Sequence, residues 1–390
     1  MKFRMTQTMR WHGPNDVVSL ADIRQAGCSG VVSALHQIPV GEVWTREAIQ
    51  ERKSMIEAHG LDWKVVESLP VHDDIKRQTG DYKLFIENYK TSIVNLAEEG
   101  IKVITYNFMP VLDWLRTHPN FTLPDGARTL RFEKDAFVSF DVFLLKRPGA
   151  ESDYTEQEIS AATTYYNKLS EEERKKLFDD MMLGLPGSDE KFTPELVLSE
   201  LEKYAHIDTQ LLKKHLSDFL NGIIPVAEKH GIAFAIHPDD PPVSVLGLPR
   251  IVSTEQDLAD IISFIDSPAN GLCFCTGSLG ARKDNDLLKM LQRFGDQVHF
   301  LHLRNTKMDD YGNFQEAEHL NGDADMPAIV KEALHIMDRR QLSIPMRPDH
   351  GFQMLDDLKK TTYPGYSAIG RLKALAELRG LEVGILHSME

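Results

Sequence analysis

Short apolar runs alternate along the chain with stretches in which apolar residues recur at helical spacing. Eight of the apolar runs are candidate strands, and they lie at residues 8–11, 30–35, 62–68, 102–108, 232–238, 271–277, 298–305 and 343–351. Parallel strands need a connection of about helix length, so the alternation predicts a parallel sheet. Eight repeats favour closure into a (β/α)8 TIM barrel over an open, doubly wound sheet.

The stretches between these runs carry helix boundary signals. "TREAIQERKSMIEAHG" and "LLKKHLSDFLNGIIPVAEKHG" both close on glycine, a common signal for the C-terminus of a helix. Ser253 and Thr254, followed by acidic residues, predict a capped helix start. After the eighth run, "GYSAIGRLKALAELRG" predicts a final amphipathic helix that ends at Gly380.

One region interrupts the alternation. Residues 112–204 show no clean strand pair, and "TEQEISAATTYYNKLSEEERKKLFDDMM" within them is charged and helical in pattern. We therefore expect one TIM-barrel domain over residues 1–390, with a mainly helical insertion at about 112–204 between strands 4 and 5. A separate small domain is the alternative interpretation.

Composition and charge narrow the classes of partner. The formal net charge of −15 argues against a nucleic-acid-binding surface, which requires a positive patch. It also means that an anionic substrate has to be held by local arginines. Three cysteines without framework spacing indicate a reducing compartment. With no secretory signal pattern at the N-terminus and no apolar run long enough for a bilayer, we expect a cytoplasmic protein without a membrane partner.

The predicted strand ends are rich in chemically active side chains. In a barrel of this kind the C-terminal strand ends face one opening, where sites are built. The residues at or just beyond these ends are His12, His36, Glu67, Asn107, His237, Cys275, His302, Arg304, Arg347, Asp349 and His350.

Four of these residues suggest a metal site. His237, Cys275, His302 and Asp349 come from strands 5 to 8, and two imidazoles, a thiolate and a carboxylate can surround a divalent cation. Each residue alone has a structural explanation, and it is the coincidence on successive strands that favours ligation. Cys273 points to the same face of its strand as Cys275, so the pattern does not choose between them.

Other residues near the strand ends have two interpretations. In "HPDDPP", Asp239 or Asp240 can orient His237, or they can cap the next segment. Tyr366, near the start of the last helix, can transfer protons or simply pack. Trp11 and His12 at the rim can form the wall of a sugar pocket or belong to the core. We find no glycine-rich phosphate loop and no GxSxG elbow.

Seven motifs taken together resemble the mannonate dehydratase family, and they span the chain from the first strand to the last helix. They are "RWHGPNDVVSL", "HPDDPP", "GLPRIVST", "CTGSLG", "FLHLRN", "RPDHG" and "PGYSAIGRLKAL". The resemblance implies a xylose-isomerase-like barrel and a hydro-lyase of hexuronate catabolism. Such an enzyme removes water from D-mannonate to give 2-dehydro-3-deoxy-D-gluconate, with Mn²⁺ or Fe²⁺ as cofactor.

The same resemblance implies roles for individual residues. Its metal ligands fall on His237, Cys275, His302 and Asp349, which selects Cys275 over Cys273. Its proton-transfer residues fall on His350 and Tyr366, with Tyr363 as a neighbouring alternative for the tyrosine.

The dehydration also requires groups that bind the substrate carboxylate. Arg347 and Arg304 are candidates for this role, with structural ion pairing as the alternative.

Other functions are compatible with the same pattern. The nearest rival function is a metal-dependent sugar isomerase or epimerase on the same barrel. A phosphodiesterase or abasic-site endonuclease and a catalytically inactive sugar-acid-binding regulator are further alternatives. We expect a homodimer or a higher homo-oligomer.

Overall fold

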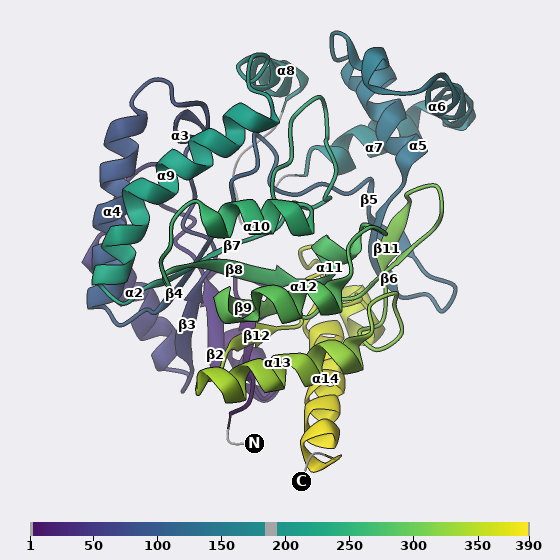
Figure 1. The fold of residues 1–390 in the computed structure, drawn as a ribbon. Coiled ribbons are helices and arrows are strands. Elements are labelled where there is room, and N and C mark those ends of the chain that lie inside the picture. Colours follow the sequence, from purple (N-terminus) through teal and green to yellow (C-terminus); the bar gives the residue numbers. More distant parts are fainter. Residues whose placement is uncertain (1–2, 184–192, 389–390) are drawn as a thin grey trace.

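The centre of the computed structural model, which describes residues 3–183 and 193–388, is a closed barrel of eight parallel strands (Figure 1). Around the barrel the order is β1-β12-β9-β8-β7-β4-β3-β2. The strands are β1 (Thr6–Arg10), β2 (Gly30–Ser33), β3 (Asp62–Val66), β4 (Val103–Tyr106), β7 (Ala233–Ile236), β8 (Asn270–Cys275), β9 (Val298–His302) and β12 (Pro345–Arg347). All eight strand predictions are confirmed.

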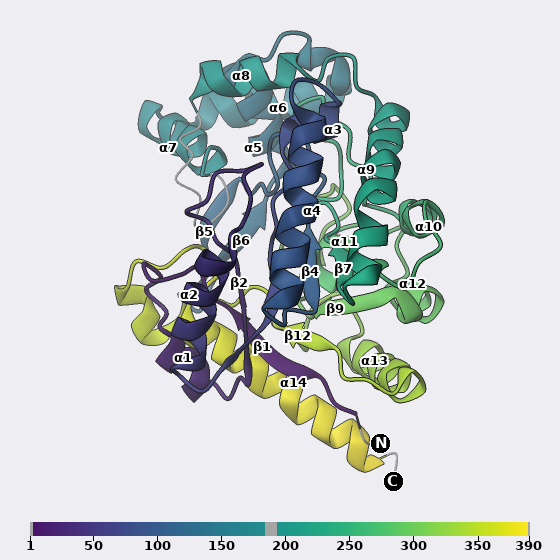
Figure 2. The same ribbon diagram turned by 90° about the vertical axis from the view of Figure 1, so that its left-hand side faces the viewer.

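Helices surround the barrel (Figure 2). They are α1 (Leu20–Gln25), α2 (Arg46–Glu57), α3 (Asp73–Arg77), α4 (Tyr82–Glu98), α9 (Thr209–Lys229), α10 (Glu255–Ser263), α11 (Thr276–Gly280), α12 (Leu287–Phe294), α13 (Met326–Arg340) and α14 (Ala368–Ser388), with short 3-10 segments η3 (Gly295–Gln297) and η4 (Leu355–Lys359). The predicted cap is confirmed, because Thr254 and Asp257 form a capping box at the start of α10. Among the described residues, no helix has both the length and the apolar character that a bilayer crossing demands.

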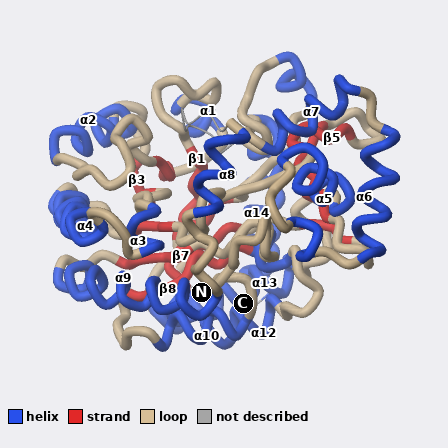
Figure 3. Tube along the Cα trace, turned by 90° about the horizontal axis from the view of Figure 1, so that it is seen from above, coloured by secondary structure: helices blue, strands red, loops and turns tan. Residues whose placement is uncertain are grey.

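The insertion lies between β4 and β7, and its buried apolar residues form a second core cluster together with Val245, Leu246, Leu248, Ala281 and Phe314 from later segments. It contains β5 (His118–Thr122), β6 (Arg128–Phe132), α5 (Lys134–Ser139), the π-helical η1 (Phe140–Leu145), the 3-10 segment η2 (Ala150–Asp153), α6 (Glu156–Lys168), α7 (Glu171–Met181) and α8 (Pro194–Glu202). Seen from above, α5, α6 and α7 gather at one side of the barrel (Figure 3). Part of the predicted insertion, residues 184–192, lies outside the described residues. The division into one domain plus insertion stays a prediction.

The expectation that the insertion lacks a strand pair was wrong. Strands β5 and β6 form an antiparallel hairpin around a turn at "LPDG", where Gly126 has a φ of 87°. Pro-Asp-Gly is a strong turn signal, and it was the clue in the sequence. The hairpin joins β10 (Thr306–Met308) and β11 (Phe314–Glu316) in a sheet of order β10-β11-β6-β5. Because β10 directly follows barrel strand β9 in the chain, this secondary sheet lies beside the barrel mouth.

The predicted end of the last helix was also wrong. Helix α14 continues through Gly380 and Gly384 to Ser388. Beyond Gly380 it still makes tertiary contacts, because Leu386 is buried and the Glu382 carboxylate accepts a hydrogen bond of 2.8 Å from the backbone N–H of Met5. Packing therefore overrides the local glycine signal.

Two glycines of α14 give a matched test of this packing. A Cβ added at Gly370 would lie 2.0 Å from the carbonyl oxygen of Phe352, whereas a Cβ at Gly380 would have no neighbour within 4 Å. We expect Gly370→Ala to lower the free energy of unfolding by about 1–3 kcal/mol through overpacking. Gly380→Ala should raise it by up to about 1 kcal/mol through helix propensity. Urea unfolding measures both, and shifts of the same sign would contradict this packing.

Candidate functional site

An apolar layer of side chains closes the barrel beneath the site. It consists of Val32, Val65, Val103, Ala235, Cys273 and Phe300. Strand side chains alternate between faces, so residues two positions further along point inward again. On β7, β8 and β9 those positions hold His237, Cys275 and His302, at the C-terminal mouth of the barrel. The apolar layer thus forms the floor on which these polar groups lie.

Above the floor is a cavity of about 550 Å³, a size typical of small-molecule sites. Its lining includes seven of the predicted site residues, namely His12, His237, Arg304, Arg347, Asp349, His350 and Tyr366. The segment that follows β4 adds Asp113 and Trp114 to the wall. Cys275 and His302 are fully buried behind the lining and contact the lining residues Asp349 and His237, respectively.

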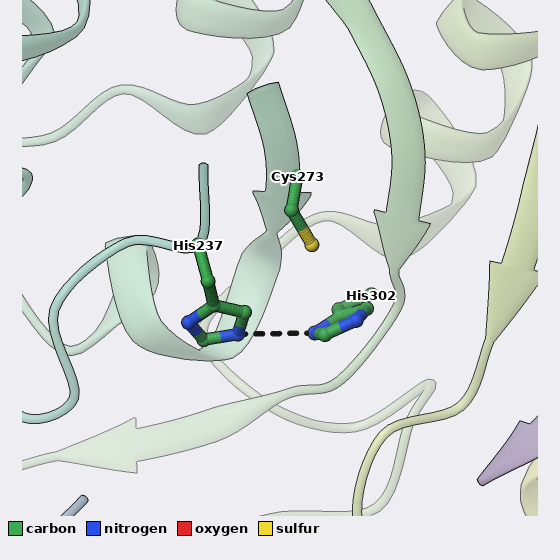
Figure 4. Close-up of side chains that lie close together, drawn as sticks. All are labelled: His237, Cys273 and His302. Carbon is green, nitrogen blue, oxygen red and sulfur yellow. Dashed lines mark hydrogen bonds between the residues drawn. The ribbon is translucent and has the colours of Figure 1, made fainter. Parts of the chain in front are cut away.

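His237 and His302 face one another across the site (Figure 4). The Nε2 atom of His237 is 3.1 Å from Nδ1 of His302. The other nitrogen of His237, Nδ1, lies 2.7 Å from the carbonyl oxygen of Pro238, which can only accept a hydrogen bond. That contact places the proton on Nδ1 and leaves a lone pair on Nε2, aimed at His302.

Asp349 and Cys275 complete a second group around His302. The Sγ atom of Cys275 is 3.6 Å from Oδ2 of Asp349, which is 3.9 Å from Nδ1 of His302. Asp349 has a φ of 61°, in the left-handed region, so the chain bends sharply just after β12. This bend lets Arg347, Asp349 and His350 all reach one cavity from a single strand end.

Cys273 remains a competitor of Cys275 by distance alone. Ligand atoms of His237, Cys273 and His302 lie within 4.8 Å of one another, as do those of Cys275, His302 and Asp349. However, Cys273 belongs to the apolar layer, and burial raises the pKa of its thiol well above the usual value. Cys275 is in register with His302, and its sulfur accepts a hydrogen bond of 3.4 Å from the backbone N–H of Ser278.

The donor set fits a divalent cation. His302 is approached by the lone pair of His237 on one side and by the Cys275 thiol and the ionised Asp349 carboxylate on the other, in a buried place where electron-pair donors repel unless a cation lies between them. Imidazole and thiolate suit zinc or iron, and a carboxylate admits manganese.

A continuous chain of buried ion pairs surrounds the donor set. Along it positive and negative side chains alternate, with nitrogen–oxygen distances of 2.6–3.6 Å. Its members, in order, are Arg10, Glu67, Arg347, Asp349, Arg304, then Asp240 and Glu316 together, and Arg116. The four arginines balance the four carboxylates, which is how a protein can bury so many charges.

The chain of ion pairs fixes the ionisation of its acids. Burial alone would raise the pKa of Asp349, but Arg347 and Arg304 hold it well below its usual value. Burial likewise opposes ionisation of Glu67, and Arg347 again lowers its pKa well below the ordinary range. Both carboxylates are therefore charged at neutral pH.

Gly277 explains how Arg304 reaches its partners. A Cβ at Gly277 would lie 1.8 Å from Nε of Arg304, so any larger residue would displace the guanidinium. The motif "CTGS" thus combines a candidate ligand, Cys275, with the opening through which Arg304 passes.

His350 and Tyr366 lie together in the cavity wall. Their rings meet edge to face, with centroids 5.2 Å apart and planes at 85°. Nδ1 of His350 is 2.8 Å from Nη1 of Arg304 and 3.1 Å from Oε1 of Glu316. Tyr363 is not among the lining residues, although its ring contacts His12. The geometry therefore favours Tyr366 over Tyr363 as the tyrosine near the cavity.

The two predicted rim residues, His12 and Trp11, lie in different environments. Neither ring nitrogen of His12 has a hydrogen-bond partner among the described residues, and burial followed by the nearby Arg10 lowers its pKa well below the usual value. His12 is thus a neutral, unpaired side chain in the cavity wall. Trp11 is instead packed in the barrel core with the Arg52 guanidinium 5.2 Å from its ring centroid, and it does not line the cavity.

The interpretation that Asp239 or Asp240 orients His237 was wrong. Asp239 accepts hydrogen bonds from the backbone N–H of Val252 and the hydroxyl of Ser253. Asp240 accepts from Arg116 and Arg304. A backbone carbonyl, which leaves no trace in the sequence pattern, takes the position beside His237.

Arg116 and Glu316 are site residues that the sequence analysis missed. Glu316 is the last residue of β11, Arg116 lies two residues before β5, and both are buried in the ion-pair chain. The "LPDG" turn of the β5–β6 hairpin was the available signal that a sheet, and not only helices, approaches the barrel mouth.

Comparisons with known proteins agree over nearly the whole chain. The family model for D-mannonate dehydratase (UxuA) matches residues 5–390. Mannonate dehydratase from Marinomonas sp. (strain MWYL1) is 52% identical over 391 residues, which cover 99% of this chain and all of the relative.

Two solved structures resemble the fold. The crystal structure of mannonate dehydratase from Streptococcus suis serotype 2 aligns with a TM-score of 0.79 and 32% identity, over 99% of this chain and 95% of that one. A xylose isomerase domain protein from Planctomyces limnophilus aligns with a TM-score of 0.51 and 12% identity, over 98% and 97% of the two chains. The second likeness supports the expected xylose-isomerase-like barrel.

The two cysteines provide a test of the donor set. We expect Cys275→Ala to weaken divalent-metal binding by more than about 100-fold, since loss of a ligand should exceed the effect of losing a group that only orients one. Cys273→Ala, a matched change two residues away, should leave metal binding unchanged. Metal stoichiometry after dialysis, with circular dichroism as the folding control, measures both. Retention of metal by Cys275→Ala and loss by Cys273→Ala would reverse the assignment.

Proposed function

The chain belongs to the D-mannonate dehydratase family, and from that premise we propose how its residues perform the reaction. It is a hydro-lyase that converts D-mannonate into 2-dehydro-3-deoxy-D-gluconate and water in hexuronate catabolism, and it depends on a divalent metal. The isomerase or epimerase alternative is not favoured. The observation that supports the residue assignments is that His302 is approached by His237 on one side and by Cys275 and Asp349 on the other, beside His350.

We propose that these four residues hold Mn²⁺ or Fe²⁺. The mixed nitrogen, sulfur and oxygen set supports a borderline transition metal more than Mg²⁺ or Ca²⁺, which prefer oxygen ligands. When bound, the cation supplies electrostatic stabilisation for the negative charge that develops as the C2 proton of the substrate leaves.

The charge of the site supports an anionic substrate. The ion-pair chain is neutral, and His12 and His36 stay uncharged, because burial lowers the pKa of His36 to about 3 and that of His12 well below its usual value. A divalent cation and the Cys275 thiolate, which ligation would deprotonate, would therefore give the donor set and its ion-pair chain one positive charge. Elsewhere in the cavity lining, Lys76 pairs with Asp73 and Asp113. A sugar-acid monoanion neutralises the positive charge of the donor set, whereas a neutral aldose or ketose does not.

Arg347 and Arg304 line the cavity, but both are already paired with Asp349. We therefore propose that they attract the substrate carboxylate through the electrostatic potential of the site.

Proton transfer falls to His350 and Tyr366. Burial raises the pKa of Tyr366, so its phenol enters the reaction protonated. We assign Tyr366 as the acid that protonates the leaving C3 hydroxyl, and His350 as the base that takes the C2 proton. The enol that remains takes up a proton at C3, loses one from the C2 hydroxyl, and becomes the 2-keto acid.

His12, with two free ring nitrogens, is placed to hydrogen-bond substrate hydroxyls. Trp11, buried outside the cavity, is left out of the substrate contacts.

We propose that the protein is cytoplasmic. All three cysteines are free and buried, which supports a reducing cytoplasm. A homodimer or higher homo-oligomer stays a prediction.

The reaction can be tested with chelator-treated protein. We expect D-mannonate to yield the 2-keto-3-deoxy acid only after a divalent metal is restored, with Mn²⁺ or Fe²⁺ more effective than Zn²⁺. His350→Asn should keep the full metal content and lose turnover by at least about 100-fold, because general acid–base groups contribute about 10²–10⁴-fold. A colorimetric assay of the product measures turnover.

His335→Asn is the matched control, since His335 is a half-buried histidine on α13 that does not line the cavity. It should retain wild-type turnover. Near-normal turnover of His350→Asn would remove His350 from proton transfer, and absence of product from metal-loaded wild type would overturn the reaction itself.

A further inference from the structure

We propose that Glu316 on β11 is a positioning residue for the dehydration, accepting the Nδ1–H of His350 and thereby presenting Nε2 to the cavity as a proton acceptor. This inference rests on the proposed role of His350 as the base. It also gives the secondary sheet a part in the reaction.

The histidine ring is confined to one orientation. Its Nδ1 is 3.1 Å from Oε1 of Glu316, and its Nε2 is 3.8 Å from Oδ1 of Asp349 on the cavity side. Tyr366 meets the ring edge to face, and Gly365 covers it so closely that an added Cβ would lie 3.0 Å from His350 Cδ2. A group bound at Nδ1 therefore determines what Nε2 can do.

Two groups compete for Nδ1, and they lead to opposite chemistry. Arg304 Nη1, 2.8 Å away, can only donate, whereas the Glu316 carboxylate can only accept. A neutral imidazole carries one proton. If Nδ1 accepted from Arg304, that proton would be on Nε2 and His350 could not act as a base. If Nδ1 donates to Glu316, Nε2 keeps its lone pair.

Glu316 is held so that it can win this competition. Its Oε1 also lies 3.4 Å from Nη1 of Arg304 and 3.4 Å from Nη2 of Arg116. The Glu316 carboxylate therefore competes with Nδ1 of His350 for the Arg304 guanidinium. Arg116 in turn is fixed by Asp240 and by the ring of Phe314, whose centroid is 4.9 Å from its Cζ.

The secondary sheet sets the position of Glu316. Strand β11 pairs with β10 and β6, and Phe314 stacks on Phe132 of β6 with ring centroids 5.3 Å apart. Glu316 is buried and does not line the cavity, so it reaches the substrate only through His350. The β5–β6 hairpin of the insertion thus supports the base from outside the barrel.

The test compares three variants with wild type, all loaded with Mn²⁺. Glu316→Gln keeps the shape of the side chain but loses the charge, and we expect kcat to fall roughly 10–100-fold, the range typical for groups that orient a functional histidine. KM for D-mannonate should change less than about threefold, because substrate contacts remain. Glu316→Asp, which restores a carboxylate, should recover part of kcat. Glu318→Gln changes an exposed glutamate two residues away and should match wild type.

Each outcome decides the proposal. A selective loss of kcat with normal metal content and rescue by aspartate supports it. Unchanged kcat in Glu316→Gln overturns it, and so does a parallel loss of metal content, KM and thermal stability, which would make Glu316 part of the scaffold. Failure of both Glu316 variants to fold would also overturn the proposal, because Glu316 would then be required for the fold. An inactive wild type would instead contradict the proposed function.

Discussion

The structure depends on one constraint, which is that charges removed from water must be paired. Four arginines and four carboxylates alternate around the cavity, all of them buried. Losing one partner of such a pair costs about 3–5 kcal/mol, so each position depends on the others. The apolar layer below excludes water, the strand ends supply most of the members, and Gly277 leaves room for Arg304. The candidate metal donors and the proposed proton-transfer groups are thereby held in place by paired charges.

The site is built from two sheets. The barrel contributes the donor set and most of the arginines, while the secondary sheet and its approach contribute Glu316 and Arg116. The two meet at Arg304, which contacts Asp349 on one side and Glu316 on the other. The insertion is therefore coupled to the chemistry through ion pairs, in addition to covering one side of the barrel.

The parts of this arrangement that follow from local pattern could be predicted from the sequence. Eight apolar runs fixed the barrel strands, and ionisable residues at their ends fixed the region of the site. Residues brought in from other segments could not be found in this way. Nothing near Arg116 or Glu316 indicates that they meet across 200 positions of the sequence. Trp11 and Asp239 are neighbours of the cavity-lining residues His12 and Asp240 in the sequence, but their side chains point elsewhere, and only packing decides that. The end of α14 was missed because tertiary contacts outweigh the cost of Gly380.

The proposed function requires the metal-loaded donor set and its ion-pair chain to carry one positive charge that a sugar-acid monoanion neutralises. The most direct test is calorimetric binding to the Mn²⁺-loaded His350→Asn variant of D-mannonate and of D-mannonamide, in which a neutral amide replaces the carboxylate. The charge balance predicts that D-mannonate binds at least about tenfold more tightly, equivalent to about 1.4 kcal/mol. Equal affinities for the two ligands would contradict it.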